Sequence, residues 1–413
     1  MAAAMDHRTD PLPFAVVTLG LAQITSWGTS YYFLGVLARP IAADTGWSLS
    51  LVFLGFTVAL LVMGAVSPWA GRATDRYGAR AVMACGTVLV SAGLLLLSTT
   101  RHEAAYLLVW ALLGIGMRLC LYDAAFAALV QVVPSRGRLA ISYLTLFGAF
   151  ASTVFWVLGH HLNEALGWRA TLVCFAAINL AVCLPLNCLG LSRRESAADP
   201  QALNALHTLA DPPLQGRARR IAIGLFAVVM SLNGFVFGVV TVQLVPLLEA
   251  AELSTTTAVW IASTKGFGQF AGRLIEILFG RRLRAITVAR FAVGALPWSF
   301  VILLAGAGNF HALLLFTLLM GASQGVITIV RGALPLAMFG VVGYGAVLGM
   351  LATPILIVNA TAPTLVALIV DTWGWNAAQG VLLFAAAASW LTMEGMSRWY
   401  ERDRGSRWLQ SAG

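Results

Sequence analysis

Long apolar stretches, separated by short clusters of Gly, Pro, Arg and Asp, run along the whole chain. Each stretch holds about 20 residues, which is the length that an α-helix needs to cross a bilayer. Runs such as 51–63 do not alternate between apolar and polar residues, so they do not fit the strands of a membrane β-barrel. The pattern predicts an all-α membrane protein with twelve transmembrane helices, at residues 14–38, 48–70, 80–99, 104–130, 139–162, 168–190, 221–247, 255–280, 284–306, 310–338, 343–369 and 375–397.

The composition points to the same class. Of 413 residues, 59% are hydrophobic and only 10% are charged, whereas an ordinary globular domain carries about 25% charge. This amount of apolar side chain argues against a soluble enzyme. A mean hydropathy of +0.84, spread over the whole length, also excludes a disordered chain, a coiled coil and a soluble domain with one anchor.

One long polar interruption divides the predicted helices six and six. It runs from Ser192 to Arg220 and is rich in Pro and Arg. We therefore expect an N-terminal six-helix bundle at 1–191, a cytoplasmic linker at 192–220 and a C-terminal six-helix bundle at 221–413. Within the linker, residues 201–209 form either a short surface helix or a loop.

The distribution of arginine predicts the orientation, because short cytoplasmic loops retain positive charge. With the N-terminus inside, the outer loops and helix ends hold only Arg39, Arg101 and Arg169, and the inner segments hold most of the others. Both termini are therefore expected in the cytoplasm, and the first apolar stretch, which follows Arg8, is expected to be a retained span of a multi-pass inner-membrane protein. The net charge of +9 then reflects topology and attraction to membrane lipid, and no nucleic-acid partner is expected.

The chain lacks the sequence motifs of several kinds of chemistry. The five cysteines lie inside apolar stretches in no paired or metal-ligand spacing, so neither a disulfide framework nor a metal site is expected. No P-loop, zinc-hydrolase or nucleophile-elbow motif is present. We expect no cofactor and no enzymatic activity, and any transport should run on an ion or solute gradient.

The two halves show weak similarity at a nearly constant offset. Pro40 and Pro246 differ by 206 positions, as do Trp27-Gly28 and Asn233-Gly234. The segment from Glu164 to Trp168 corresponds to the segment from Asp371 to Trp375 at an offset of 207. A duplicated six-helix unit predicts such spacing.

The segment after the second span reads Gly71-Arg72-Ala73-Thr74-Asp75-Arg76-Tyr77-Gly78-Ala79-Arg80. It resembles the G-x-x-x-D-R-x-G-R-type loop between the second and third helices of the major facilitator superfamily. A degenerate second copy contains Arg273 and Glu276. The resemblance implies the major facilitator fold, with two six-helix bundles, a mid-membrane substrate site between them and alternating access by rocking.

This segment is expected to act as a gating loop. The carboxylate of Asp75 can accept hydrogen bonds from a neighbouring helix N-terminus, and Arg72 and Arg76 can bridge to the other half and hold one state closed. Gly71, Gly78 and Arg80 complete the motif, and Arg273 and Glu276 are expected to serve gating or packing in the second half, with ligand contact as their alternative role. The alternative is a merely solvated charged turn.

Ionisable residues inside spans are candidates for function, because their burial in a membrane is costly. Lys265 is the only lysine of the chain and lies about 15 Å into the eighth span, near the bilayer midplane. A cavity-facing ammonium there would bind an anion, and Gln269 is one turn further on the same face. The alternative is a structural pair with a carboxylate of another helix.

The fourth span contains Arg118, Tyr122 and Asp123. Arg118 is expected to be a second anion contact or half of an interhelix pair, with Tyr122 on its face. Asp123 lies about 140° round a regular helix from Arg118, so a pair within that helix is not expected. The repeat brings Asp123 nearly level with Arg331, and the two are expected to form a gate pair, or Asp123 carries a coupled proton. Arg331 could instead extend to the inner surface.

Polar and aromatic residues of the helices expected to line the cavity complete the candidate site. They are Trp27, Tyr31, Asn233 and Asn359. For the aromatic residues, simple packing is the competing interpretation.

The run Gly46-Trp47-Ser48, with Ser67-Pro68 and the Gly71 segment, resembles the bacterial monocarboxylate and oxalate/formate branch of the superfamily. That resemblance implies a cation in the eighth helix that holds a carboxylate, a part that Lys265 could play. The branch usually has Arg there, and the D-G-x-x-W-type signature of the animal carriers is missing. The fifth span also lacks the Gly-Pro pair of the drug/proton antiporters.

We therefore expect a monomeric secondary transporter for a small, monocarboxylate-like organic anion, coupled to protons. One alternative is an efflux carrier for an amphipathic drug or metabolite. Another is a membrane sensor or scaffold with a vestigial transporter fold.

Overall fold

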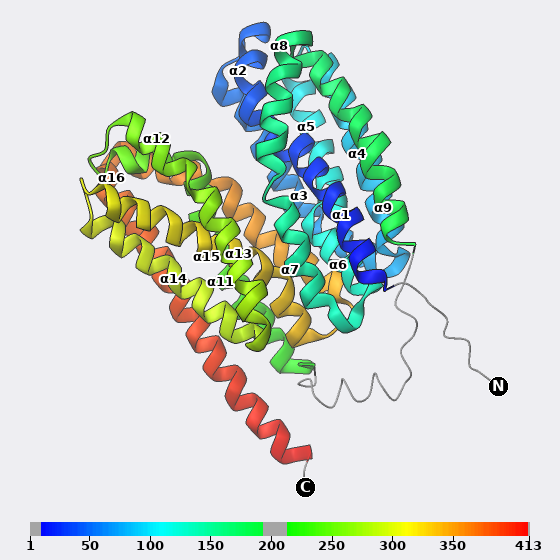
Figure 1. Cartoon of the computed structure of the whole chain (residues 1–413), viewed down its shortest axis with the longest axis vertical. Coiled ribbons are helices and arrows are strands. Elements are labelled where there is room, and N and C mark those ends of the chain that lie inside the picture. Colours follow the sequence, from blue (N-terminus) through cyan, green and yellow to red (C-terminus); the bar gives the residue numbers. More distant parts are fainter. Residues whose placement is uncertain (1–9, 193–212, 412–413) are drawn as a thin grey trace, which may run out of the picture.

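The computed structural model describes residues 10–192 and 213–411, without the side chains of Arg281 and residues 405–411. All regular elements of this part of the chain are helices, grouped in two bundles that lie side by side (Figure 1). The elements of the first bundle are α1 (Pro11–Trp27), η1 (Gly28–Tyr32), α2 (Leu34–Thr45), α3 (Leu49–Tyr77), α4 (Ala79–Thr99), α5 (Glu103–Cys120), α6 (Tyr122–Val132), η2 (Pro134–Arg136), α7 (Gly137–Gly148), α8 (Ala151–Ile178), η3 (Asn179–Cys183) and α9 (Leu184–Gly190). Those of the second are α11 (Gly216–Glu249), α12 (Thr255–Ser263), α13 (Lys265–Phe279), η4 (Gly280–Arg282), α14 (Ala285–Ala305), α15 (Phe310–Phe339) and α16 (Tyr344–Ser411).

The helices supply twelve crossings, which confirms the predicted fold class. In the described residues, eight helical stretches are long and apolar enough to cross a membrane. Two of them, Pro134–Gly190 and Tyr344–Arg404, turn back at Gly167 and Gly374 and cross twice. Two further crossings are broken helices, α1 with α2 and α12 with α13.

The backbone carries the internal repeat more clearly than the side chains do. Gly46 has a φ of 74°, and Glu252, 206 positions later, has a φ of 67° and is the only non-glycine with positive φ among the described residues. Two positions after each, Ser48 and Ser254 cap the next helix with their side chains. The duplicated unit therefore explains why a glutamate adopts a backbone conformation that favours glycine.

The polar linker is shorter than predicted at its C-terminal end. Helix α11 starts at Gly216, and Leu214 just before it is buried and donates its backbone N–H to the carbonyl of Met338, 2.8 Å away. The linker is thus fixed to the end of α15. The predicted surface helix at 201–209 lies outside the described residues.

The expected loop at Gly71–Arg80 is wrong, because these residues are helical. Helix α3 continues to Tyr77, Gly78 is the single non-helical residue with a φ of 83°, and α4 begins at Ala79. The motif is therefore the last two turns of one helix and the start of the next. Its side chains are held by helix geometry and not by a flexible turn.

Small residues let several helices approach until backbones touch. On α13 and α15, Gly268 and Gly272 face Gly321 and Gly325, and a Cβ at any of them would collide with the backbone of the other helix. This small-xxx-small spacing on both partners is a typical membrane packing motif. It places the side chains of α13 on the opposite side, toward the first bundle.

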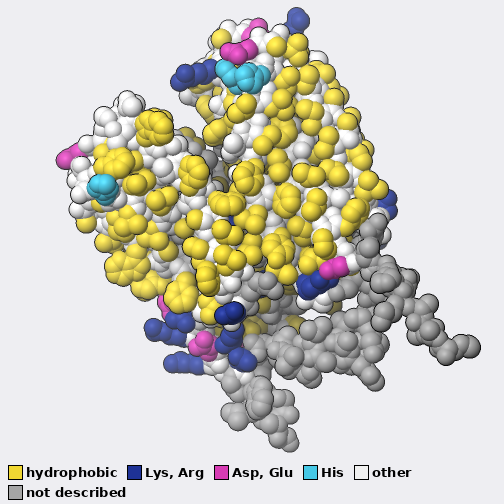
Figure 2. Space-filling model, viewed as in Figure 1, with side chains coloured by type: hydrophobic (Ala, Val, Ile, Leu, Met, Phe, Trp, Pro, Cys, Tyr) yellow, Lys and Arg dark blue, Asp and Glu magenta, His cyan; other side chains and the backbone are white. Residues whose placement is uncertain are grey.

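The bundles meet at one end of the molecule and diverge at the other (Figures 1 and 2). We call the end where α1 begins and α16 ends the closed end, and the opposite end the open end. Hydrophobic side chains cover the visible flanks of both lobes, and Lys and Arg gather around the closed end (Figure 2). Apolar residues also cross the junction, since Ala352, Leu356 and Ala360 of α16 pack into the core of the first bundle.

An ion pair fixes the first helix at the closed end. Asp10 caps α1 and receives two hydrogen bonds from Arg136, at 2.8 and 2.6 Å. The Arg136 guanidinium lowers the pKa of Asp10 to about 2. The stabilisation by this pair is therefore present above the ordinary pKa of an aspartate and is lost only as the pH falls toward 2.

We expect Gly374→Ala to lower the melting temperature of the purified protein in detergent, because alanine at φ 77° and ψ 176°, a region that essentially only glycine adopts, is strained by about 1–3 kcal/mol. Gly380→Ala on the same helix is the matched control, since nothing lies within 4 Å of the added methyl group and alanine favours a helix. Equal melting temperatures for the two variants would contradict the assignment of a strained turn.

Candidate functional site

A cavity of about 180 Å³ lies between the two bundles. At about 30 Å³ for each water in the liquid, this space corresponds to about six waters, which is enough for a small solute. Both bundles contribute walls. The predicted site residues that line it are Trp27, Tyr31, Tyr122, Asp123, Asn233, Gln269, Arg273, Arg331 and Asn359.

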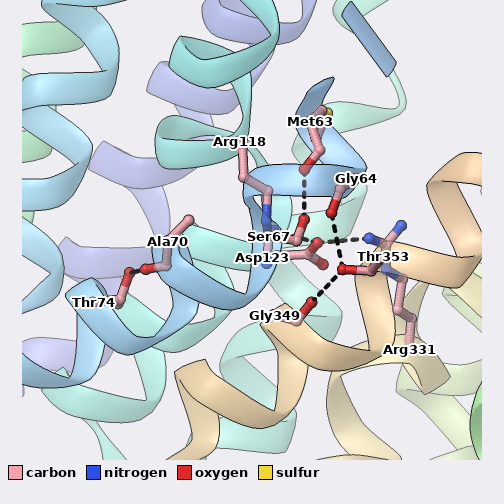
Figure 3. Close-up of polar contacts among 10 residues, drawn as sticks. All are labelled: Met63, Gly64, Ser67, Ala70, Thr74, Arg118, Asp123, Arg331, Gly349 and Thr353. Atoms are coloured by element: carbon pink, nitrogen blue, oxygen red, sulfur yellow. Dashed lines mark hydrogen bonds and ion pairs between the residues drawn. The ribbon is translucent and has the colours of Figure 1, made fainter. Parts of the chain in front are cut away.

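Asp123 stands at the floor of the cavity between two guanidinium groups (Figure 3). One of its oxygens accepts from Arg118 at 2.5 Å and from Arg331 at 2.6 Å. Arg118 belongs to the first bundle and Arg331 to the second, so the carboxylate links the halves. Because two cations share one carboxylate, the cluster keeps a net positive charge.

The prediction that Arg118 and Asp123 do not pair within their span is wrong, because the span is not a regular helix. Leu121, with φ −82° and ψ −166°, breaks it into α5 and α6 and rotates Asp123 toward Arg118. Gln23 of α1 compensates the break, since its amide donates to the carbonyl of Cys120 at 2.8 Å. Arg118 is buried behind Asp123 and does not line the cavity.

The expected juxtaposition of Asp123 and Arg331 is present. Beside it, α3 and α16 form a seam of small residues across the halves. A Cβ at Gly71 would collide with the carbonyl of Gly345, and one at Gly349 with the carbonyl of Ser67. Thr353 of α16 donates to the carbonyl of Gly64 at 2.9 Å (Figure 3). We call these contacts the α3–α16 seam.

Asp75 ends the seam, with the geometry that the motif predicts. Its two oxygens accept the backbone N–H groups of Gly345 and Ala346 at the start of α16, at 2.9 and 2.7 Å. A carboxylate is favoured at this position because a helix N-terminus carries partial positive charge. The motif therefore joins the two halves through one carboxylate.

The arginines of the motif behave differently from the expectation. Arg72 donates to the carbonyl of Pro68 and lies over Trp69, and Arg76 lies over the ring of Tyr77. Both contacts are on their own helix, so neither arginine bridges to the other half in this state. Arg80 is exposed.

A different arginine makes the bridge. Arg138 of α7 forms an ion pair of 3.1 Å with Glu276 and donates to the carbonyls of Gly280 and Leu283, all in the second half. Sequence reasoning treated Arg138 only as a topological charge. The signal that could have found it was Glu276, a carboxylate inside a span with no partner in its own half.

Helix α13 presents a row of polar side chains to the cavity. Gln269 and Arg273 line it, and Lys265, one turn toward the open end, places its ammonium 5.4 Å from the centre of the Phe237 ring, which also lines it. Arg273 is buried and donates to the carbonyl of Thr145 at 2.9 Å. No carboxylate of the described chain lies within ion-pair distance of Lys265 or Arg273, so the structural pair considered for Lys265 is absent from this part of the chain.

Two buried amide side chains of the second bundle, Asn233 and Gln324, have atoms without a hydrogen-bond partner. Asn233 donates to Val229 and Ser389, but its carbonyl oxygen has no hydrogen bond. Gln324 lines the cavity, is 5% exposed and has no partner for either amide atom. Asn359 donates to the carbonyl of Gly234. Unpaired buried amides are costly, so these groups are suited to a polar ligand.

Aromatic rings cover the wall that the first bundle supplies. Trp27 is in contact with Tyr31 and Tyr122, with ring centroids 4.8 and 4.9 Å apart. Tyr32 also lines the cavity and was not predicted. It reaches the cavity because η1 is a π-helical turn, which rotates the chain away from regular helical spacing.

The residues that the structure describes contain no cluster of three or more His, Cys, Asp or Glu side chains that could hold a metal ion. The cysteines in this region are free, and Cys120 and Cys183 are buried in helix packing.

Comparison with known proteins relates this geometry to a family. Residues 19–306 match the family model of the Major Facilitator Superfamily. The chain is 27% identical over 197 residues to the multidrug resistance protein MdtL of Citrobacter koseri, a match that covers 45% of this chain and 50% of MdtL. It is 26% identical over 263 residues to the uncharacterized MFS-type transporter YcxA of Bacillus subtilis, covering 60% of this chain and 61% of YcxA. The chain therefore matches about half to three fifths of the length of these relatives.

Among solved structures, the human organic anion transporter MFSD10 (TETRAN) superposes with a TM-score of 0.70. The superposition covers 93% of this chain and 100% of that chain, at 18% sequence identity. At this identity the likeness shows the fold alone.

We expect Asp123→Asn to destabilise the protein by about 3–5 kcal/mol, because it leaves the buried Arg118 without a counter-charge. Glu394→Gln is the matched control, since it makes the same chemical change in the more exposed pair with Arg290 and should cost about 1 kcal/mol or less. Thermal unfolding in detergent measures both variants. Equal losses would show that the buried cluster does not depend on its carboxylate.

Proposed function

We propose that this chain, which belongs to the Major Facilitator Superfamily, is a membrane transporter and not an enzyme, and that it carries a small organic anion of monocarboxylate type by secondary active transport. The observation that carries the proposal is the excess of cations around the cavity. Asp123 is shared by two guanidinium groups, and Arg273 and Lys265 have no carboxylate partner in the described chain. A buried cation without a partner is costly, and an anionic ligand would supply the missing charge.

Polar atoms on the same wall support this assignment. Gln269 is one turn from both Lys265 and Arg273, and Gln324 of the neighbouring helix offers two donors and one acceptor without partners. A carboxylate needs several donors that converge on a small volume. Gln269, Arg273 and Gln324 all line the cavity and supply donors from two adjacent helices.

Alternating access fits the distribution of contacts between the halves. The contacts at the closed end are the Asp123–Arg331 and Arg138–Glu276 ion pairs, the hydrogen bonds of Asp75 and the α3–α16 seam. We propose that rocking separates these contacts and brings the bundles together at the open end. The motif at Gly71–Arg80 then contributes to the gate through Gly71, which packs against α16, and through Asp75.

The orientation follows from charge. Lys and Arg gather around the closed end (Figure 2), so we propose that this end faces the cytoplasm of the cell's inner membrane. The described state is then open to the outside. Both termini are cytoplasmic in this orientation.

Coupling to protons would involve a carboxylate that changes partners. Asp123 and Glu276 each bind an arginine of the other half, so each would lose a cation when the closed end opens. Proton uptake by either carboxylate would offset that loss. We propose one of these two residues as the coupling site.

Drug efflux is the second candidate function, and the named relatives favour it. MdtL is described as a multidrug resistance protein, and the aromatic wall offers a surface to an amphipathic compound. This candidate differs from the first in the charge of its ligand. A cationic or neutral compound would not need Lys265 or Arg273.

We expect Lys265→Gln and Arg273→Gln to weaken the binding of small carboxylates about 10- to 100-fold, the amount that one charge-assisted hydrogen bond contributes. Thermal shift in detergent measures it, because a ligand of the folded state raises the melting temperature. Arg80→Gln, a change of an exposed charge, is the control and should bind as the wild type does. Stabilisation by cationic drugs alone, unchanged in both variants, would establish drug efflux in place of anion transport.

In proteoliposomes, an inward-directed proton gradient of one pH unit is expected to drive accumulation of the anion up to about tenfold for one proton per substrate. Asp123→Asn and Glu276→Gln identify the coupling carboxylate, because only the variant of that residue should lose the response to pH while still exchanging substrate. Accumulation that follows a sodium gradient and ignores pH would refute proton coupling.

A further inference from the structure

The cavity has two chemically different walls. Five aromatic residues of the first bundle form one of them, which we call the aromatic wall: Trp27, Tyr31, Tyr32, Tyr122 and Phe126. Trp27 stands at its centre, with the rings of Tyr31, Tyr122 and Tyr32 at 4.8, 4.9 and 5.9 Å. The ring of Phe126 stacks on that of Tyr122 at 5.3 Å. The wall is therefore a continuous π surface.

The second bundle supplies the more polar wall, which we call the polar wall, although Phe237, at the repeat position of Tyr31, also belongs to it. Trp27 and Asn233 are equivalent positions, 206 residues apart, and both line the cavity. The first bundle thus has the aromatic ring of Trp27 where the second bundle has the amide of Asn233. The cations Arg273 and Lys265 have no counterpart on the aromatic wall.

Local structure holds the tyrosines at the cavity. The π-helical turn η1 brings the consecutive residues Tyr31 and Tyr32 to the same space, although a regular helix would point them 100° apart. Neither hydroxyl has a hydrogen-bond partner in the described chain, and both side chains are half-buried. Rings that serve packing alone would be covered by other helices, whereas these border an open space.

The two walls are close enough for one small ligand to touch both. Tyr122 of the aromatic wall and Arg273 of the polar wall both donate to the carbonyl of Thr145, at 3.5 and 2.9 Å. A carboxylate at Arg273 would therefore place its substituent against the aromatic wall. A planar ring gains more there than an aliphatic group of the same size, because aromatic pairs attract each other beyond simple area burial.

We propose that the substrate is an aryl carboxylate, with its ring on Trp27 and its carboxylate at Arg273. This inference rests on the proposed anion transport and narrows the substrate class. It requires no residue beyond those that already line the cavity or contact its lining.

Benzoate and cyclohexanecarboxylate are the decisive pair of probes, because they share the carboxylate and differ mainly in the aromaticity of the ring. We expect wild-type protein to bind benzoate about fivefold more tightly, measured by thermal shift or calorimetry in detergent. Benzylamine and benzyl alcohol carry the same ring without the negative charge and should bind weakly. The comparison needs no variant, so it does not depend on a mutant that folds.

Variants of Trp27 show whether this residue causes the preference for benzoate. Trp27→Leu should reduce the ratio of the two affinities to near one, whereas Trp27→Phe keeps a ring and should keep most of the ratio. Trp298→Leu is the matched control, because Trp298 is 57% exposed on the outside of the second bundle and should leave the ratio unchanged.

The outcomes separate this inference from the proposed function. Equal affinity for benzoate and cyclohexanecarboxylate in the wild type, with loss of both in Lys265→Gln, would overturn the aryl preference and leave anion transport standing. A preference for benzoate that Trp27→Leu does not change would also overturn the placement of the ring. Binding of benzylamine or benzyl alcohol, but of neither carboxylate, would overturn the proposed anion transport itself.

Discussion

One carboxylate shared by two arginines is the interaction on which the rest of the structure depends. Asp123 neutralises Arg118 within its own bundle and at the same time holds Arg331 of the other bundle. A single negative charge therefore closes the floor of the cavity, joins the halves and leaves a positive balance above the floor. The arrangement makes the cavity receptive to an anion and adds an ionised contact to the closure of this end.

The remaining contacts at the closed end share a property with Asp123, since each has one partner in each half. Asp75 meets the start of α16, Arg138 meets Glu276, and Thr353 meets Gly64. Most of them involve a charge or a backbone carbonyl, and water can replace such partners when the halves separate. Closure thus combines polar contacts that can be exchanged for solvent with apolar contacts of α15 and α16 against the cores of the first bundle.

The sequence allowed the fold class and part of the site to be predicted, because both depend on periodicity and charge. Span length, the repeat offset and the cost of charges in membranes pointed to the twelve crossings and to the pairing of Asp123 with Arg331. Local breaks could not be predicted. The kink at Leu121 depends on Gln23 of another helix, and the π-turn that exposes Tyr32 depends on packing around Gly28. The role of Arg138 was hidden because its partner lies 138 positions away.

The α3–α16 seam has a consequence for how such chains diverge. Its positions tolerate nothing larger than the residues they hold, because backbone meets backbone at Gly71 and Gly349. Apart from Gly148 and Gly234, where an added Cβ would meet neighbouring atoms, the residues of the cavity walls border open space. Related carriers that keep this seam can therefore change their substrate through substitutions in the cavity walls, while the contacts that open and close the transporter stay the same.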